Sequence, residues 1–344
     1  MPTNLVPARA TGVGSFFKSL TTIRPKESKL TVGLDLGSSS IKAVVLGPRK
    51  GLGARPIVGQ QSHPFDQSTE TDPSSVIKNV LGSLRLPVKS LNLAVSGPWV
   101  IMRIIEMPAM KPNEMRQALP FEAQRYLPFN LQDVVLDGVV LGPGEANKNW
   151  VLIVACKKEL IERRIDWIRR AGFEVDIIDV DALAIANGFL STQTRSSGYQ
   201  TVALVDLGAQ LSNLVIFKGQ APYLVRDIPW GGDKLIRQVS EQLGLEAQAL
   251  KELWNKAQLH PQQSEAMKLA TEPLINELQL SFDYFENRFG QPPEKVLLSG
   301  GLTHVPGLID AIKSHLTQSV NSWAPIKDLP SQFSVAYGLA LRSR

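Results

Sequence analysis

Short apolar runs separated by glycine- and serine-rich turns form the first clear pattern in the chain. The run from Leu30 to Asp35 predicts a strand, which ends in the turn residues Gly37-Ser38-Ser39-Ser40. A second apolar run, Ile41 to Leu46, follows at once, and two strands joined by such a turn predict a β-hairpin. We also predict a helix over 75–84 and a strand over 91–95. Residues 50–75 are rich in Gly, Gln, Ser and Asp and indicate an irregular surface segment.

The pattern changes from residue 100 onward. Strands are predicted over 100–106, 134–141 and 150–156, with a helix over 113–119 between the first two. A helix over 158–171 then ends at Gly172, a residue type that favours the C-terminal cap of a helix. This mixture is typical of a small α+β subdomain inserted within a larger lobe.

The second half of the chain restarts the pattern of the first half. Val202 to Gly208 is again an apolar strand that ends in Asp-x-Gly, and a second predicted strand, 211–217, follows it. An internal repeat of this kind implies two similarly built lobes that face one another. The remaining predicted elements are helices after Gly231-Gly232 and over 246–257, 263–289 and 335–342, and a strand from Val296 that ends in Gly300-Gly301.

These elements predict an α/β fold of the two-lobed kind and divide the chain into segments. The predicted segments are a mobile N-terminal arm (1–29), the first-lobe core (30–99 and 173–198), an inserted α+β subdomain (100–172), a second lobe (199–322, with a helical part over about 233–290) and a C-terminal segment that returns to the first lobe (323–344).

Composition narrows the class of protein. The chain has 344 residues, of which 43% are hydrophobic and 20% charged, as in globular proteins. Its single cysteine, Cys156, excludes an internal disulfide, lies in an apolar run that predicts a buried thiol, and fits a reducing cytoplasm. No run approaches the ~20 apolar residues that a membrane span needs. The net charge of +5 comes without any nucleic-acid-binding motif, so we expect no nucleic-acid partner.

The repeated Asp-x-Gly turn points to phosphate chemistry. A strand that ends in such a turn brings backbone N–H groups close to a phosphate, because glycine lets the backbone approach and serine hydroxyls add donors. The aspartate can hold Mg²⁺ or its bound water, since Mg²⁺ prefers oxygen ligands. Two such turns on opposite lobes, together with Leu298-Ser299-Gly300-Gly301, predict a cleft that grips a nucleotide from both sides.

Here the sequence resembles a known superfamily. Val32 to Lys42 is similar to the first phosphate loop of the actin, sugar-kinase and heat-shock chaperone superfamily, whose fold is the actin-like (ribonuclease H-like) one. Val205 to Gly208 is similar to the second phosphate loop, and Leu297 to Gly301 to the adenosine motif. Within that superfamily, the segments Ser96-Gly97-Pro98, Phe121 to Phe129 and Arg226-Asp227-Ile228 resemble the PilM family of type IV pilus assembly proteins. The inserted subdomain also resembles that of FtsA proteins.

The resemblance implies ATP and Mg²⁺ as ligands and assigns roles to individual residues. Asp35 and Asp206 would hold Mg²⁺, largely through water, and Asp181 stands where the superfamily usually places a water-orienting residue. That aspartate is equally typical of a helix N-cap. The remaining residues implied to bind the nucleotide are Gly37, Ser38, Ser39, Lys42, Gly208, Ser212, Gly232, Gly300 and Gly301.

The second phosphate loop departs from the pattern of active ATPases. It reads Asp-Leu-Gly-Ala-Gln, and Ala209 and Gln210 stand where the superfamily often has further glycines. Their side chains narrow the space for a terminal phosphate. We therefore expect nucleotide binding with weak or absent ATPase activity.

The resemblance also implies partners. In the family, a cytoplasmic protein binds the N-terminal tail of an inner-membrane PilN-like protein in a groove beside the inserted subdomain, and so associates with the inner face of the membrane. Candidates for lining that groove are Arg103, Glu106, Phe121, Tyr126 and Phe129. Self-assembly into a ring or other oligomer is a further expectation. The machine served is a type IV pilus or a related secretion system. Two alternatives stay open at this point, an FtsA-like filament-forming division protein and a small-molecule kinase of the same superfamily.

Overall fold

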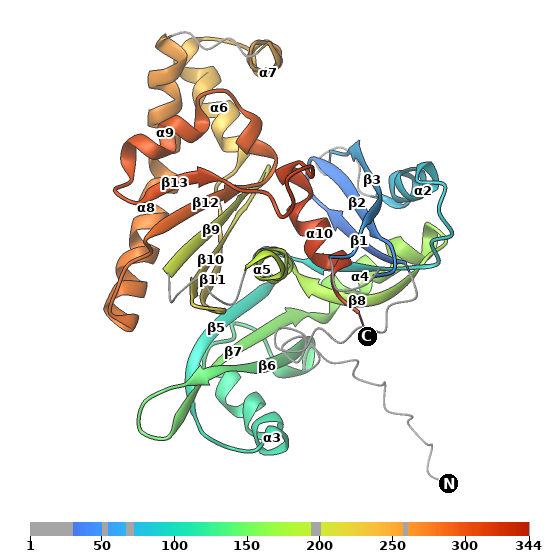
Figure 1. Ribbon diagram of the computed structural model, residues 1–344, viewed down its shortest axis with the longest axis vertical. Coiled ribbons are helices and arrows are strands. Elements are labelled where there is room, and N and C mark those ends of the chain that lie inside the picture. The colour runs from blue at the N-terminus through green and yellow to red at the C-terminus, as the bar shows by residue number, and fades with distance from the viewer. Residues whose placement is uncertain (1–29, 50–53, 67–71, 194–200, 257–260, 344) are drawn as a thin grey trace.

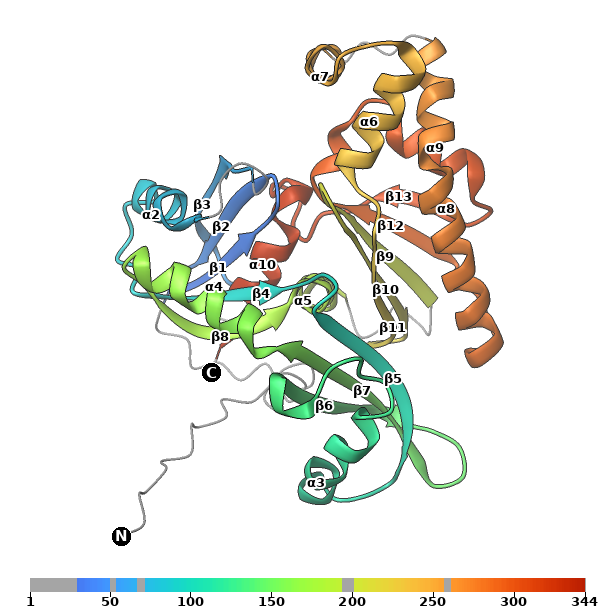
Figure 2. The same cartoon turned by 180° about the vertical axis from the view of Figure 1, so that it is seen from behind.

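Two lobes of similar build and a smaller inserted subdomain make up the protein (Figure 1). The computed structural model describes residues 30–49, 54–66, 72–193, 201–256 and 261–343. The predicted N-terminal arm, residues 1–29, lies outside the described residues. Seen from behind, each lobe has its own sheet, and the inserted subdomain projects below both (Figure 2).

The first lobe is built on a five-stranded sheet in the order β3-β2-β1-β4-β8. β1 and β2 form the predicted hairpin, and β3 continues it as an antiparallel meander, whereas β4 and β8 run parallel to β1. The strands are β1 (Thr31–Leu36), β2 (Ser40–Leu46), β3 (Ile57–Pro64), β4 (Ser90–Val95) and β8 (Glu174–Val180), and the helices packed on them are α2 (Ser74–Ser83), α4 (Lys158–Arg170), α5 (Asp181–Thr192) and α10 (Ser334–Ala340).

The prediction of an irregular segment over residues 50–75 is wrong where β3 forms. β3 pairs with β2 along its length, for example Gln60 opposite Val44, and none of its side chains is fully buried. It is an edge strand, so its order comes from backbone hydrogen bonds to β2 and not from an apolar face. A polar edge strand leaves no hydrophobic alternation in the sequence for a pattern to detect.

The second lobe repeats the sheet of the first lobe. Its order, β11-β10-β9-β12-β13, has the same sequence of one three-stranded antiparallel meander and two parallel strands. The internal repeat is therefore confirmed. The strands are β9 (Thr201–Leu207), β10 (Ser212–Lys218), β11 (Ala221–Ile228), β12 (Lys295–Ser299) and β13 (Ser319–Ser322), with α6 (Gly232–Leu243), α7 (Ala247–Asn255), α8 (Pro261–Phe289), α9 (Leu308–His315) and the short 3-10 helices η3 (Gly301–His304) and η4 (Ser331–Phe333).

The inserted subdomain is a three-stranded antiparallel sheet, in the order β5-β7-β6, with one helix. Ile105 and Met107 of β5 pack under the helix, and Met102 and Ile104 face the central core of the molecule. The elements are β5 (Val100–Pro108), α3 (Pro112–Ala123), the 3-10 turn η2 (Leu131–Asp133), β6 (Val134–Pro143) and β7 (Lys148–Lys157). α3 runs four residues beyond the predicted end at residue 119 and includes Phe121.

α4 follows β7 directly and packs its Ile168, with Ala171 just after it, into the core of the first lobe. Its Leu160 joins the central core instead. The predicted insert boundary at residue 172 stays a prediction, but these contacts make α4 a bridge between the subdomain and the first-lobe sheet.

The inserted subdomain also rests on the second lobe. The Trp150 ring of β7 contacts the Tyr223 ring of β11 edge-on at 6.4 Å and the Phe289 ring at the end of α8 at 5.2 Å. The Arg288 guanidinium lies 4.7 Å from the centroid of the Trp150 ring, within cation–π range.

Within the described residues, no helix is long and apolar enough to cross a membrane.

α10 lies against both β1 and α5, and two glycines allow this close approach. A Cβ on Gly33 of β1 would lie 1.9 Å from the Ala336 carbonyl oxygen, and a Cβ on Gly338 would lie 1.7 Å from the Ala184 carbonyl oxygen. The Asn92 amide on β4 adds two hydrogen bonds to the end of the helix, at 2.8 Å to Leu339 O and 2.9 Å to Arg342 O. The C-terminal helix is therefore held in the first lobe by backbone contact.

We predict that Gly338→Ala destabilises the protein, because its methyl group meets the α5 backbone and cannot be accommodated by a side-chain rotation. The expected loss is about 3 kcal/mol, measured as a lower midpoint of urea unfolding followed by circular dichroism. Gly82→Ala in α2 is the matched control. No atom lies within 4 Å of its added Cβ, so it should be neutral or raise stability by about 0.5–1 kcal/mol. Equal effects of the two substitutions would contradict this account of α10.

Candidate functional site

Two aspartates stand at equivalent strand ends and face each other across the lobes. Asp35 is the penultimate residue of β1, and Asp206 is the penultimate residue of β9. Both are buried, at 8% exposure each. Lys42, directly across the β1–β2 hairpin, donates from its Nζ to Asp35 Oδ2 at 3.0 Å. The structure thus brings the two predicted Mg²⁺-holding carboxylates and the predicted lysine to one place.

A row of polar side chains crosses the second-lobe sheet at the same level. Strand pairing sets Ser299 beside Asp206, Asp206 opposite Asn213, and Asn213 opposite Asp227. Paired residues on neighbouring strands share one face of a sheet, so all four lie on one face. Asn213 Oδ1 and Asp227 Oδ1 are buried and have no hydrogen-bond partner among the described residues. Unpartnered buried oxygens beside Asp206 are suited to a ligand that supplies donors or positive charge.

At this point the charged groups of the two lobes shift one another's pKa values. Burial raises the pKa of Asp206 to about 7, and the negative charges of Asp35 and Asp181 add to the rise, while Lys42 and a hydrogen bond from Ser299 oppose it. Burial works to lower the pKa of Lys42, but the carboxylates of Asp35, Asp206 and Asp181 outweigh it, and that pKa is raised. The cluster therefore favours an added cation.

Asp181 is the first residue of α5, one position beyond the N-cap, Val180, so it does not cap the helix. Burial raises the pKa of Asp181 to about 7, with Asp35 adding to the rise, and a hydrogen bond from the Ser96 side chain opposes it. The neighbouring Gly97 N–H donates to Asp227 Oδ2 at 2.7 Å. The Ser96-Gly97 turn therefore links an aspartate of the first lobe to an aspartate of the second.

The glycines of the predicted phosphate loops are required by close contacts. A Cβ on Gly37 would lie 2.8 Å from the Ser40 carbonyl oxygen, and one on Gly208 would lie 2.6 Å from the Leu211 carbonyl oxygen. Gly300 has a φ of +92° and would place a Cβ 2.5 Å from the Leu207 carbonyl oxygen. Next to it, Gly301 has open space around its Cβ position. These turns keep backbone, and not side chains, at the surface of the site.

Four other predicted residues have more varied surroundings. Ser38 is partly exposed and Ser39 is exposed in the β1–β2 turn, so both are accessible to a ligand. The Ser212 hydroxyl is fully buried and donates to the Trp230 carbonyl oxygen at 2.8 Å. α6 begins at Gly232 as predicted, but the Gly232 N–H donates to the Gly208 carbonyl oxygen at 3.0 Å. Both contacts fasten α6 to the second phosphate loop.

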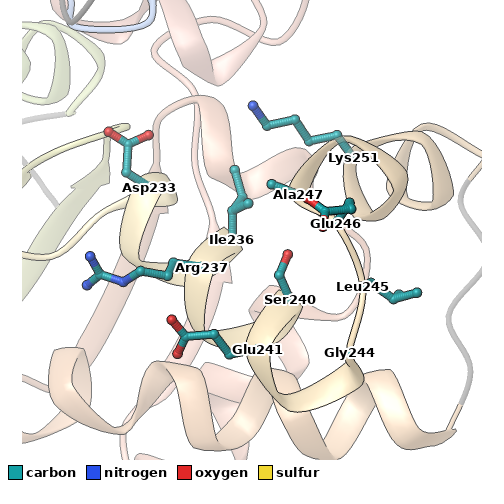
Figure 3. Close-up of a pocket in the computed structure, with 10 residues that line it drawn as sticks. All are labelled: Asp233, Ile236, Arg237, Ser240, Glu241, Gly244, Leu245, Glu246, Ala247 and Lys251. Atoms are coloured by element: carbon teal, nitrogen blue, oxygen red, sulfur yellow. The ribbon is translucent and has the colours of Figure 1, made fainter.

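A hollow of about 490 Å³ lies between α6 and α7 (Figure 3). Asp233, at the start of α6, is next to Gly232, and Lys251 of α7 stands across the hollow from Arg237 and Ser240 of α6. The Ser240 hydroxyl is buried and has no hydrogen-bond partner within the described residues. Six of the ten lining residues are polar or charged, namely Asp233, Arg237, Ser240, Glu241, Glu246 and Lys251, so the hollow suits a polar end of a small ligand, such as a sugar.

The residues fit a Mg²⁺-bound nucleotide in their chemistry. Asp35 and Asp206 supply oxygen ligands for Mg²⁺ or its water, and Lys42 supplies a positive charge for phosphate. Ser38 and Ser39 of the first turn are accessible to a phosphate, whereas the Gly208 N–H of the second turn donates to the Leu211 carbonyl oxygen at 3.1 Å. The unpartnered oxygens of Asn213 and Asp227 indicate a polar ligand between the lobes.

The five predicted groove residues do not all converge. Arg103 is exposed on the α3 face of β5, whereas Glu106 lies on the opposite face and pairs with Lys148 at 3.6 Å. Side chains three positions apart on a strand point to opposite faces, so one groove cannot be lined by both. Phe121 and Tyr126 are exposed, at 76% and 42%. Lys157 Nζ lies 4.6 Å from the centroid of the Phe129 ring and 3.9 Å from the centroid of the Trp99 ring.

Sequence reasoning missed three polar residues of the site. Asp227 lies inside the Arg226-Asp227-Ile228 segment, so a signal existed, but its role depends on strand register. Asn213 follows the second loop on β10 without a distinctive pattern. Arg164 is one of four arginines in α4, and its Nη1 donates to the Leu36 carbonyl oxygen at 3.1 Å. No spacing rule separates it from the other three.

Comparison with known proteins supports the architecture. The structure superimposes on the solved PilM–PilN type IV pilus biogenesis complex with a TM-score of 0.77 and 24% identity, over 90% of this chain and 97% of that one. The ethanolamine utilization protein EutJ from Carboxydothermus hydrogenoformans matches with a TM-score of 0.54 and 13% identity, over 94% of each chain. Cell division protein FtsA of Pseudomonas aeruginosa is 27% identical over 261 residues, 66% of this chain and 61% of that protein. The chain therefore matches less than two thirds of the length of this relative.

The duplicated sheets and the inserted subdomain define an actin-like protein, which confirms the predicted fold class. Residues 33–344 match the family described as type IV pilus assembly protein PilM. The chain belongs to that family.

We predict that the acidic cluster makes stability depend on pH. An unfolded aspartate has a pKa near 4, whereas Asp206 has one of about 7, so the folded state holds the extra proton and loses stability as pH rises between these values. Asp206→Asn removes this loss. Its stability relative to wild type should rise by about 2 kcal/mol between pH ~5 and pH ~8, measured by urea unfolding without Mg²⁺ or nucleotide. Asp283→Asn, on the exposed side of α8, should show no such trend. Parallel pH curves for wild type and Asp206→Asn would rule out this assignment.

Proposed function

We propose that this protein is a nucleotide-binding scaffold for type IV pilus assembly. It binds Mg–ATP between its lobes and holds the cytoplasmic tail of a PilN-like inner-membrane protein beside its inserted subdomain. The observation that carries the nucleotide part is the meeting of Asp35, with its Lys42 partner, and Asp206 at equivalent ends of two duplicated sheets. In open α/β sheets, ligands bind at such strand ends.

The nucleotide would extend from the two phosphate loops toward the helices of the second lobe. Its phosphates would meet the turns at Gly37 and Gly208, with Mg²⁺ near Asp35 and Asp206. Its adenosine would lie toward Gly301 and the hollow between α6 and α7. When bound, Mg²⁺ supplies charge neutralisation for the phosphates, and the protein's own residues orient them.

Turnover is a smaller part of the proposal. A pKa of about 7 suits Asp181 to accept a water proton near neutral pH, so the second phosphate loop, and not this residue, weighs against turnover. Ala209 stands in the second loop where a glycine would leave more room, and its carbonyl oxygen already accepts the Asp233 N–H at 2.9 Å. We propose weak or absent ATPase activity, with ATP acting as a ligand that sets the arrangement of the lobes.

The partner part rests on the family, on the PilM–PilN complex whose fold this chain shares, and on exposed aromatic side chains of the inserted subdomain. Large exposed apolar side chains near one another are typical of protein-binding surfaces. Phe121 and Tyr126 are exposed, and the rings of Trp99 and Phe129 flank Lys157. Through this partner the protein would stand at the cytoplasmic face of the inner membrane.

We predict that Asp35→Asn abolishes the effect of nucleotide on partner binding. Calorimetric titration of a peptide from the PilN-like cytoplasmic tail should give an affinity that changes with Mg–ATP in wild type and stays constant in Asp35→Asn. The physical reason is that the amide removes a negative charge that would hold Mg²⁺. Asp283→Asn, which makes the same substitution on the exposed side of α8, is the control and should behave as wild type. No tail binding under any condition would count against the scaffold function.

Phe121→Ala should weaken tail binding by about tenfold or more while leaving ATP affinity unchanged, because a large aromatic anchor is lost from the proposed surface. Leu280→Ala is the matched control, since Leu280 is 63% exposed on α8 of the second lobe. The same calorimetric titration measures both. A loss with Leu280→Ala and none with Phe121→Ala would move the partner surface to the second lobe.

A further inference from the structure

Arg164 reaches the nucleotide site from α4, outside both phosphate loops. Its Nη1 donates to the carbonyl oxygen of Leu36, the last residue of β1, at 3.1 Å. Leu36 lies between Asp35 and Gly37, so this hydrogen bond holds the backbone at the root of the first phosphate loop. The contact joins residues 128 positions apart in the chain and forms only in the folded protein.

The guanidinium of Arg164 is largely enclosed and only partly satisfied. Its Nε is buried and has no hydrogen-bond partner among the described residues. Burial works to lower its pKa, and the carboxylates of Asp181 and then Asp35 oppose this. Arg163 and the Cys156 thiol are the other ionisable groups that act on it. The cation also lies 5.6 Å from the centroid of the Trp167 ring.

The excess of negative charge in the site indicates what this cation can do. Four carboxylates meet between the lobes, those of Asp35, Asp181, Asp206 and Asp227. A nucleotide phosphate chain entering such a cluster needs positive groups besides Mg²⁺. Lys42 is bonded to Asp35, which leaves Arg164 as a second cation near the same end of the site. An arginine stays charged when buried and presents several donors in a fixed plane.

The position of Arg164 along the site matters as well. The hollow between α6 and α7 and the open space at Gly301 lie on the second lobe, where the adenosine would bind. Arg164 stands on the first lobe, beside Leu36 of the first phosphate loop, and therefore on the other side of the site from the proposed adenosine position. From there its charge would act on the phosphate end of the nucleotide.

We propose that Arg164 is a positioning residue of the nucleotide site, which fixes the first phosphate loop through Leu36 and makes the site prefer a triphosphate to a diphosphate. The inference rests on the nucleotide binding proposed above. It assigns to α4, which follows directly from β7 of the inserted subdomain, a direct part in sensing the nucleotide.

The test measures affinity for fluorescent ATP and ADP analogues with Mg²⁺ in the full chain. Arg164→Met should weaken ATP binding by about tenfold or more and ADP binding by less than about threefold, because a charge near the terminal phosphate is lost. Arg164→Lys should restore part of the preference for ATP. The matched control is Arg163→Met. Arg163 is exposed and lies 5.4 Å from the same Trp167 ring, so its removal should leave both affinities unchanged.

A spectroscopic signal separates a positioning role from a merely structural one. Mg–ATP should change the emission of Trp167, obtained as the difference between wild type and Trp167→Phe, because the ligand redistributes the charge beside the ring. The change should persist in Arg163→Met and disappear in Arg164→Met. Thermal unfolding of each variant shows whether the fold is kept.

The outcomes are distinguishable. Failure of the wild type to bind either nucleotide would overturn the proposed nucleotide site and, with it, this inference. Wild-type binding with equal losses of ATP and ADP in Arg164→Met, or with no loss, would overturn the inference alone. If Arg164→Met does not fold, Arg164→Lys decides. A reduced but retained preference for ATP, with the Trp167 response kept, supports the proposal, and an unchanged preference or equal weakening of both nucleotides contradicts it.

Discussion

The close packing of α10 between β1 and α5 is the constraint on which the rest of the structure depends. Gly33 and Gly338 remove the two Cβ atoms that would keep these backbones apart. Once α10 is in place, its Ser334 hydroxyl hydrogen-bonds with Ser299 at 2.6 Å at the end of β12, which ties the C-terminal helix of the first lobe to the second-lobe sheet. Ser299 is in turn the neighbour of Asp206. The position of the second acidic turn relative to the first therefore depends on a helix–strand contact that leaves no room for a side chain.

Between the lobes, the protein concentrates charge that it does not fully neutralise. Buried carboxylates are costly unless they are paired, and Lys42 and Arg164 offset only part of the charge of four aspartates. Burial first and the neighbouring carboxylates second raise the pKa values of Asp181 and Asp206, and Asn213 Oδ1 and Asp227 Oδ1 have no hydrogen-bond partner among the described residues. A site of this kind is arranged for a ligand that brings cations and donors, at some cost to the stability of the ligand-free protein. This is the physical basis for the coupling that we propose between a nucleotide and the lobe arrangement.

The inserted subdomain is placed to respond to that arrangement. It is connected to the first lobe by the Ser96-Gly97 turn and by α4, and it touches the second lobe through Trp150 and Tyr223. The turn is held by Asp227 from one lobe and Asp181 from the other. A change in the spacing of those aspartates would therefore move the start of β5, the strand that carries the subdomain. The alternation of side chains along β5 limits a partner surface to one face, which separates Arg103 from Glu106.

By itself the sequence determined the strand–turn–strand units, their duplication and the aspartates and glycines of both turns, because local apolar runs and turn residues encode them directly. It did not reveal β3 or β11, whose polar or proline-containing strands are held by pairing with neighbours, nor β13, which is only four residues long. Only the tertiary structure decided that Asn213 and Asp227 share a row with Asp206, and that Arg164 reaches Leu36 from a helix 128 residues away. The reason is that strand register and long-range packing set which side chains meet, and neither leaves a trace in the spacing of residues along one chain.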